Sequence, residues 1–299
     1  MAALTAIPDP TLIRLPDGRD LETWVVGPDD GETLIFIHGS PGAGMPDPAD
    51  VAEAIERGLR WISWSRPGYG ASTPLPDRSV AHIAADAAAV LDHLGIDRAH
   101  VVGHSGGGPH AIACAALLPP RVAGAATIGG VAPYGAAGLD WFAGMGPENV
   151  HEFGETLKGR EAETAAVERM GPAWRVVTGA DIIAAFGGLI DVVDAGSLTS
   201  AYGEFLAAEC RHALSQSYEG WIDDDLAFAK PWGVDLAAVQ PPVHIWQGAH
   251  DRMVPFGHGQ WLAAHVSSAC PHLFAEHGHL SLVVDSFGAI LDELVAPAR

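Results

Sequence analysis

The chain has 299 residues, of which 48% are hydrophobic, and a formal net charge of -21 at pH 7. This length suffices for one large domain or for a domain with an insertion. Such an acidic chain is not expected to bind nucleic acid or an anionic membrane surface. Its cysteines, Cys114, Cys210 and Cys270, form no CxxC pair, so the sequence predicts neither a disulfide framework nor a zinc site.

The sequence contains no uninterrupted run of eighteen apolar residues, and its first residues lack the basic and apolar regions of a signal peptide. We therefore expect a soluble, cytoplasmic protein. Cys114 lies in an alanine-rich run and is expected to be a small core residue. The sequence does not determine the oligomeric state, and a homo-oligomer is one of the alternatives.

Short apolar runs alternate with helical patterns along most of the chain. Residues 11–15 and 21–26, separated by the turn PDGRD, predict an antiparallel hairpin. Further strands are expected at 33–39, 59–66, 100–105, 122–130, 243–249 and 272–278, and helices at 49–58, 80–94, 107–118, 259–266 and 280–295. This alternation predicts an α/β fold with a mostly parallel, doubly wound sheet and helices on both faces.

The alternation stops between residues 136 and 225, where the pattern is helical and lacks strand signals. We predict that 136–225 is a helical insertion between two strands of the sheet. Residues 1–135 and 226–299 then form the core.

The stretch VVGHSGGGPH, residues 101–110, places Ser105 among four glycines between a predicted strand and a predicted helix. The pattern G-x-S-x-G in this context is typical of a nucleophile elbow, which exposes the serine hydroxyl at the edge of the sheet. The alternative is a glycine-rich phosphate loop, but its lysine and its glycine spacing are missing. We interpret Ser105 as a nucleophile.

A nucleophilic serine needs a base and an acid that orients it. Asp251 and His279 each follow a predicted strand, and the order serine, aspartate, histidine is the one expected for this sheet. His277 is the competing base. Among other aspartates, Asp194, Asp223, Asp224 and Asp225 are expected on a solvated face or at a helix cap.

Two backbone N–H groups are expected to stabilise the oxyanion. One belongs to Gly106, directly after the nucleophile. The other belongs to Ser40 in the loop HGSPG, where Gly39 and Gly42 allow the backbone to approach closely. His104, next to the nucleophile, is expected to line the substrate pocket.

The motifs HGSPG, SRPGYGAS, GHSGGG, GAHDRMVP and GHLS, in this order, resemble those of the α/β-hydrolase superfamily, in particular its esterase and proline iminopeptidase-like members. The resemblance implies this fold and a serine nucleophile, and it covers nearly the whole chain outside the insertion. Two departures limit it. Haloalkane dehalogenases and epoxide hydrolases carry aspartate where Ser105 stands. Proline iminopeptidases usually show glycine where Ser40 stands, and their tryptophan–glutamate pattern is missing from the insertion.

In this superfamily, an insertion at this place resembles a cap over the catalytic serine. Some of its large apolar residues are expected to contact substrate, with Trp141, Phe142, Phe205 and Trp221 as the candidates. Glu204 and Glu209 are expected on a wet helical face, or alternatively as a recognition site for a cationic substrate group.

These residues predict a cofactor-independent serine hydrolase that cleaves a small ester, thioester, lactone or amide through an acyl-enzyme. No metal is expected, because no His, Asp or Glu cluster has ligand spacing in the sequence. One alternative is a proline iminopeptidase-like aminopeptidase. Another is a catalytically silent small-molecule receptor, since some members of the superfamily have become receptors.

Overall fold

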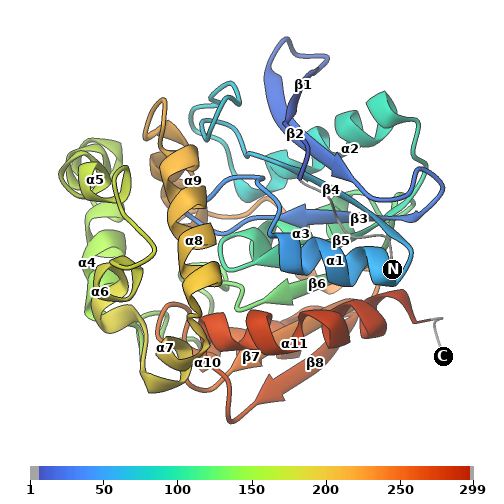
Figure 1. The fold of residues 1–299 in the computed structure, drawn as a ribbon. Coiled ribbons are helices and arrows are strands. Elements are labelled where there is room, and N and C mark those ends of the chain that lie inside the picture. Colours follow the sequence, from blue (N-terminus) through green and yellow to red (C-terminus); the bar gives the residue numbers. More distant parts are fainter. Residues whose placement is uncertain (1–6, 297–299) are drawn as a thin grey trace.

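The computed structural model describes residues 7–296, and these form an eight-stranded sheet with helices on both faces (Figure 1). The strand order is β1-β2-β4-β3-β5-β6-β7-β8, with β1 and β2 antiparallel to their neighbours and the rest parallel. The strands are β1 Thr11–Arg14, β2 Asp20–Val26, β3 Glu32–Ile37, β4 Leu59–Trp64, β5 Ala99–His104, β6 Val122–Ile128, β7 Val243–Gly248 and β8 Ala269–Phe274. The predicted fold class and the amino-terminal hairpin are confirmed.

The last strand differs from its prediction at 272–278. β8 includes Pro271, a residue type that usually interrupts strands. Because β8 is an edge strand, a residue without an N–H is tolerated there. Residues 275–278 instead form the loop that leads to His279.

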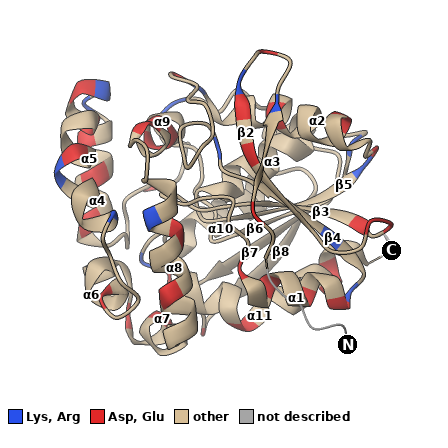
Figure 2. Cartoon of the chain, turned by 45° about the horizontal axis from the view of Figure 1, so that its top comes forward, with Lys and Arg blue, Asp and Glu red and all other residues tan. Residues whose placement is uncertain are grey.

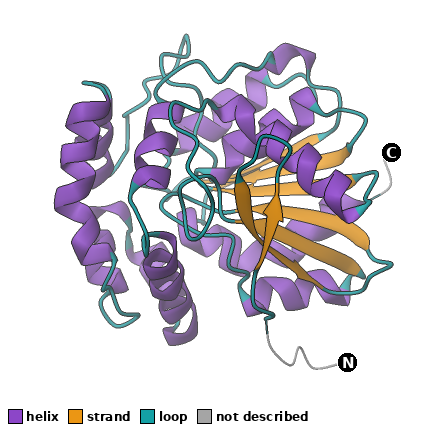
Figure 3. Ribbon diagram, turned by 90° about the horizontal axis from the view of Figure 1, so that it is seen from above, coloured by secondary structure: helices purple, strands orange, loops and turns teal. Residues whose placement is uncertain are grey.

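Helices cover the two faces of the sheet, as Figure 3 shows from above. Side chains of α1 and α11 belong to the core cluster on one face, and those of α2, α3 and α10 belong to the cluster on the other. These helices are α1 Pro48–Glu56, α2 Ile83–Leu94, α3 Gly107–Leu117, α10 Phe256–His265 and α11 His279–Val295.

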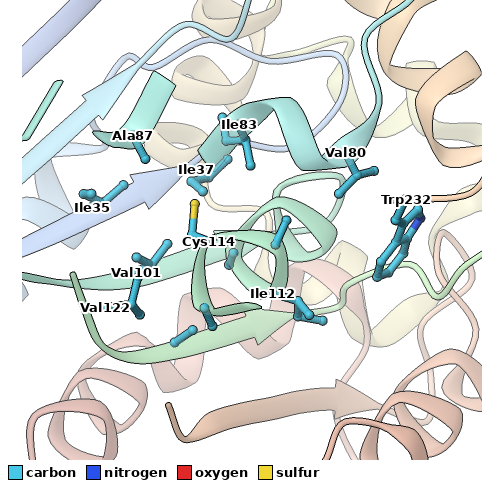
Figure 4. Close-up of a cluster of buried hydrophobic side chains, with 14 of the residues drawn as sticks. Ile35, Ile37, Val80, Ile83, Ala87, Val101, Ile112, Cys114, Val122 and Trp232 are labelled. Atoms are coloured by element: carbon cyan, nitrogen blue, oxygen red, sulfur yellow. The ribbon is translucent and has the colours of Figure 1, made fainter. Parts of the chain in front are cut away.

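The strands alternate their side chains between these two clusters, as a sheet buried on both faces requires. Ile35 and Val101 belong to the cluster under α2 and α3, and their neighbours Leu34 and Val102 belong to the cluster under α1 and α11. Cys114 is buried in the first cluster, as predicted (Figure 4). This packing fixes the carboxyl ends of the parallel strands, where the candidate site lies.

A helical insertion connects β6 to β7. Helices α8 and α9 lie between the sheet and helices α4 to α6 (Figure 1). The six helices are α4 Pro147–Thr156, α5 Arg160–Trp174, α6 Ile182–Phe186, α7 Val192–Ser197, α8 Ser200–Ala213 and α9 Glu219–Phe228. The predicted boundary at residue 225 falls inside α9, because the helical pattern of that stretch continues to Phe228. Among residues 7–296, no helix is long and apolar enough to span a membrane.

Candidate active site

Ser105 lies in the sharp turn between β5 and α3. Its backbone φ is 54°, a left-handed conformation that residues other than glycine rarely adopt. Its glycine neighbours are required sterically. A Cβ on Gly103 would lie 2.1 Å from the carbonyl oxygen of Gly107, and a Cβ on Gly107 would lie 2.1 Å from that of Ile37. The turn can therefore form only with glycine at both positions, and it holds Ser105 in a strained backbone geometry.

Asp251 and His279 meet at the carboxyl end of the sheet. Asp251 follows β7, His279 is the first residue of α11, and His279 Nδ1 lies 2.7 Å from Asp251 Oδ2. The other carboxylate oxygen of Asp251 accepts hydrogen bonds from the backbone N–H groups of Met253 and Val254. Gln247 Nε2 donates to Oδ2 at 2.9 Å. These donors orient the carboxylate toward the imidazole.

Burial acts on both members of this pair. It would lower the pKa of His279, but the charge and hydrogen bond of Asp251 outweigh it, so the pKa of His279 lies above its usual value. Burial also raises the pKa of Asp251, and the interaction with His279 offsets only part of that rise.

His277, the competing base, points away from this pair. Its Nδ1 lies 3.8 Å from Asp285, and its ring packs on Phe274. Ser105, His104 and His279 line one cavity, and the rings of His104 and His279 are 4.9 Å apart. Burial lowers the pKa of His104 to about 3, so this imidazole is neutral near pH 7.

Asp194, expected on a solvated face or at a helix cap, is buried and caps a helix that the sequence did not identify. It is buried on α7 and accepts hydrogen bonds from the backbone N–H groups of His279, Leu280 and Ser281. It therefore caps the amino terminus of α11, a helix remote from it in sequence, and fixes the position of His279. Nothing in the local sequence around Asp194 identifies a cap for so distant a helix.

Ser40 and Gly106 lie against each other beside Ser105. A Cβ on Gly106 would lie 2.5 Å from Ser40 Oγ, and a Cβ on Gly39 would lie 3.3 Å from Ser105 Cβ. Within residues 7–296, no hydrogen bond uses the backbone N–H of Ser40 or Gly106. Both groups are therefore free to donate to a substrate oxygen.

A buried ion pair holds this loop, which we call the Ser40 loop (residues 38–42). Asp224 of α9 accepts from Ser40 Oγ at 2.7 Å and pairs with Arg66. Arg66 in turn donates to Ser40 Oγ at 2.8 Å and to the carbonyl oxygens of His38 and Gly39. Arg78 also pairs with Asp224, at 2.7 Å. The last helix of the insertion is thereby connected directly to the loop beside the nucleophile.

The prediction for the three consecutive aspartates was wrong, because Asp223, Asp224 and Asp225 are buried rather than solvated. Two of them pair with arginines, Asp224 with Arg66 and Asp223 with Arg78. Sequence spacing gave no signal for these pairs, which join residues far apart in the chain.

We expect Asp224→Asn to lower kcat by about ten- to a hundredfold, since a displaced oxyanion donor typically costs this much or more. KM for a small ester should change much less, because Asp224 lines neither cavity beside Ser105. The matched control is Asp223→Asn on the same helix, since Asp223 pairs with Arg78 and Arg160 and does not contact the Ser40 loop. Steady-state kinetics and melting curves of both variants provide the test. Equal loss of kcat in the two variants would show that helix docking alone matters.

Two cavities open at Ser105, with volumes of about 110 and 410 Å³. Both are bounded by Ser40, Pro41 and Ser105 of the core and by Trp174 and Phe186 of the insertion. Phe205 lines the smaller cavity and Trp221 the larger one.

The prediction that Trp141 and Phe142 contact substrate was wrong, because neither residue lines a cavity beside Ser105. Trp141 is buried in the core cluster under α3 and α10 and donates from Nε1 to the carbonyl oxygen of Ala132 at 2.7 Å. Phe142 packs against the same cluster. Their position just after β6 puts them in the connection that precedes α4.

The two glutamates of α8 differ from each other. Glu209 lines the smaller cavity, accepts from the backbone N–H of Ala43, and has its pKa raised by burial to about 8. It is therefore not part of a wet helical face. Glu204 is exposed and lines neither cavity beside Ser105.

Two side-chain clusters among the described residues have the composition of cation ligands. Glu152, Glu163 and Asp225 meet between helices of the insertion. His244 of β7, His272 of β8 and Glu293 of α11 form the other cluster. The expected absence of a metal stays a prediction.

The sheet topology, and the placement of Ser105, Asp251 and His279 at the carboxyl ends of its strands, can be compared with known protein families. A family model described as "alpha/beta hydrolase fold" matches residues 32–167, and this match supports membership of the α/β-hydrolase superfamily. Among curated proteins, the chain is 29% identical to a 2-hydroxy-6-oxononadienedioate/2-hydroxy-6-oxononatrienedioate hydrolase of Cupriavidus pinatubonensis, over 83% of this chain and 80% of that one. It is 35% identical to a bifunctional esterase/perhydrolase of Acinetobacter calcoaceticus, over 40% of this chain and 45% of that one.

Among solved structures, the chain is similar to an alpha/beta hydrolase fold protein from Nakamurella multipartita. The TM-score is 0.67 at 25% identity, covering 95% of this chain and 97% of that one. Together these likenesses support an enzyme of the hydrolase class.

Proposed function

We propose that the protein is a serine hydrolase that cleaves an ester through an acyl-enzyme intermediate. The observation that carries this proposal is the 2.7 Å contact between His279 and Asp251 at the cavity that Ser105 lines from its strained turn. A catalytic role explains why a nucleophile, a base and an orienting acid from three separate strand ends lie together, whereas a purely structural role does not.

In the proposed mechanism, His279 takes the proton of Ser105 as Oγ attacks the carbonyl carbon, and Asp251 stabilises the resulting imidazolium. The N–H groups of Gly106 and Ser40 donate to the oxyanion. The leaving group departs, and a water activated by His279 then releases the acyl group from Ser105. Because Ser105 lies between two cavities, the acyl and alcohol portions of the substrate each have a separate space.

The cavity walls favour a substrate without carboxylates. No Lys or Arg among the described residues lines either cavity, whereas Glu209, Glu152 and Asp225 do. A dicarboxylate, which the name of the Cupriavidus relative denotes, would place its charges beside these groups without a cationic partner. We therefore propose a substrate that is neutral or positively charged.

An aminopeptidase is the second candidate, and the same acidic walls favour it because its substrate carries a free ammonium. A panel of substrates separates the two candidates. We expect short-chain 4-nitrophenyl esters to be hydrolysed at least about a hundredfold faster than proline or alanine 4-nitroanilides. A phenolate departs unaided, whereas an aniline needs proton donation by His279. Blocking the amino group of the anilides is the control. Preferential cleavage of the unblocked anilides would replace the esterase proposal with the aminopeptidase.

A further inference from the structure

Three carboxyl side chains from three helices of the insertion meet beside the larger cavity. They are Glu152 of α4, Glu163 of α5 and Asp225 of α9, and one oxygen of each lies within 4.8 Å of the others. Glu163 and Asp225 are buried and Glu152 is half-buried. We call these residues the carboxylate cluster. Glu152 and Asp225 line the cavity that also contains Ser105.

Apart from hydrogen bonds among its own carboxyl groups, the carboxylate cluster accepts hydrogen bonds only from neutral groups within residues 7–296. Trp221 Nε1 donates to Glu152 at 2.5 Å, and Thr156 Oγ1 donates to Glu163 at 2.7 Å. Arg160, although it lies on α5, pairs with Glu219 and Asp223 instead. Acidic residues, red in Figure 2, occur along both α5 and α9.

Asp225 is the least satisfied member of the cluster. It is 2% exposed, and its Oδ2 has no N–H or O–H donor among the described residues. A buried carboxylate oxygen without a donor is costly, and only a proton shared with a neighbouring carboxyl or an external cation can relieve it. Because Asp225 lines the cavity, such a cation can come from a ligand.

Burial and mutual repulsion both disfavour ionisation here. Burial raises the pKa of Glu152 to about 7, and burial together with Glu152 and Glu163 raises the pKa of Asp225 well above its usual value. Glu155 of α4 and Asp224 of α9 add further negative charge. Without a bound cation the cluster therefore holds protons near pH 7, and a cation that binds would displace protons from it.

We propose that the carboxylate cluster binds a protonated primary amine carried by the substrate. An alkylammonium offers three N–H donors; Glu152 and Asp225 present carboxyl oxygens to the cavity, and a carboxyl oxygen of Glu163 lies within 4.8 Å of both. Phe153, Trp221 and Phe228 line the same cavity and provide an apolar surface for the carbon chain of the amine. This inference rests on the proposed function, because it assumes that the same substrate presents its carbonyl to Ser105.

A resident divalent metal ion fits these surroundings less well. Mg²⁺ and Ca²⁺ require six or more oxygen ligands, whereas the carboxylate cluster offers three carboxyl groups, of which only those of Glu152 and Asp225 line the cavity. Trp221 and Thr156 also already occupy lone pairs of two members. A cavity of about 410 Å³ has the size of an organic ligand.

Calorimetric titration of the wild-type protein with hexylammonium, 1-hexanol and hexanoate at pH 7 tests the proposal. We expect hexylammonium to bind at least about tenfold more tightly than hexanol, because charge-assisted hydrogen bonds replace neutral ones, and hexanoate to bind most weakly. Titration in two buffers of different ionisation enthalpy should also show proton release on hexylammonium binding. Equal affinity for the amine and the alcohol would overturn the proposal.

Three variants locate the effect. Glu152→Gln and Asp225→Asn should each abolish both the preference for hexylammonium and the proton release. Glu148→Gln is the matched control, since Glu148 lines the same cavity but accepts from the backbone N–H of Gly188 outside the cluster. A preference that survives in both cluster variants contradicts the proposal. So does saturable CaCl2 binding that Asp225→Asn abolishes, if no preference for hexylammonium accompanies it.

The outcomes for the two proposals are distinguishable. Hexylammonium binding as expected, in a protein that hydrolyses no ester, would support the amine site and reject the proposed ester hydrolase. Rapid ester hydrolysis without any preference for the amine would do the reverse.

Discussion

Replacing Ser105 with alanine is expected to lower kcat/KM for a 4-nitrophenyl ester by about 10⁴-fold or more. The hydroxyl is the proposed attacking atom, and neither the oxyanion donors nor His279 can form the acyl-enzyme without it. Alanine leaves the glycine contacts of the turn in place, so the fold should persist. Equal melting temperatures of wild type and variant would establish this, and Ser215→Ala, at an exposed serine, is the control for unspecific effects.

Fluorophosphonate labelling extends this experiment to the receptor alternative. An activated serine should be modified in the wild-type protein at Ser105 only, and the label should disappear in Ser105→Ala and after heat denaturation. A catalytically silent receptor would show neither labelling nor ester turnover. Undiminished turnover in Ser105→Ala would refute the serine mechanism itself.

The sequence predicted those parts of the fold that depend on local patterns. Alternating apolar residues identified the strands, and Gly95, which ends α2 with φ 67, is a recognisable helix stop. The G-x-S-x-G spacing around Ser105 also carries its own steric reason, because the Cβ contacts that exclude alanine lie within the motif and the adjacent strand β3. Such features can be read from a few neighbouring residues.

Features that depend on the folding of the insertion could not be predicted in this way. Asp224 reads as one of three consecutive acidic residues, yet its environment is set by Arg66, which is distant in sequence. Glu152 and Asp225 likewise meet only because α4, α5 and α9 pack together. Trp141 was expected to contact substrate because it is a large apolar residue of the insertion, but it packs in the core next to His258. Helical periodicity identifies a buried face without showing what that face is packed against.

Asp251→Asn is the second change for which we expect a large effect, a fall in kcat of about 10³- to 10⁴-fold. The carboxylate at 2.7 Å both orients the His279 ring and stabilises the imidazolium formed during attack. An asparagine amide can hold the ring in the wrong tautomer, with its basic nitrogen turned away from Ser105. The matched control is Asp285→Asn, which removes the carboxylate next to the other histidine of this loop, His277, and should leave kcat unchanged.

The pH dependence provides an independent readout of the same residue. His279 must be neutral to accept the proton, so kcat/KM of the wild type should rise with pH along a limb whose midpoint lies above the ordinary histidine value of about 6.5. In Asp251→Asn the larger of the two charges that raise the pKa of His279 is lost, whereas the smaller contribution of Asp194 and the burial that lowers this pKa both remain. The residual activity should therefore titrate at a lower pH than that of the wild type. An unchanged midpoint would show that the charge of Asp251 does not act on the titrating base, and it would contradict the pairing of Asp251 with His279 in catalysis.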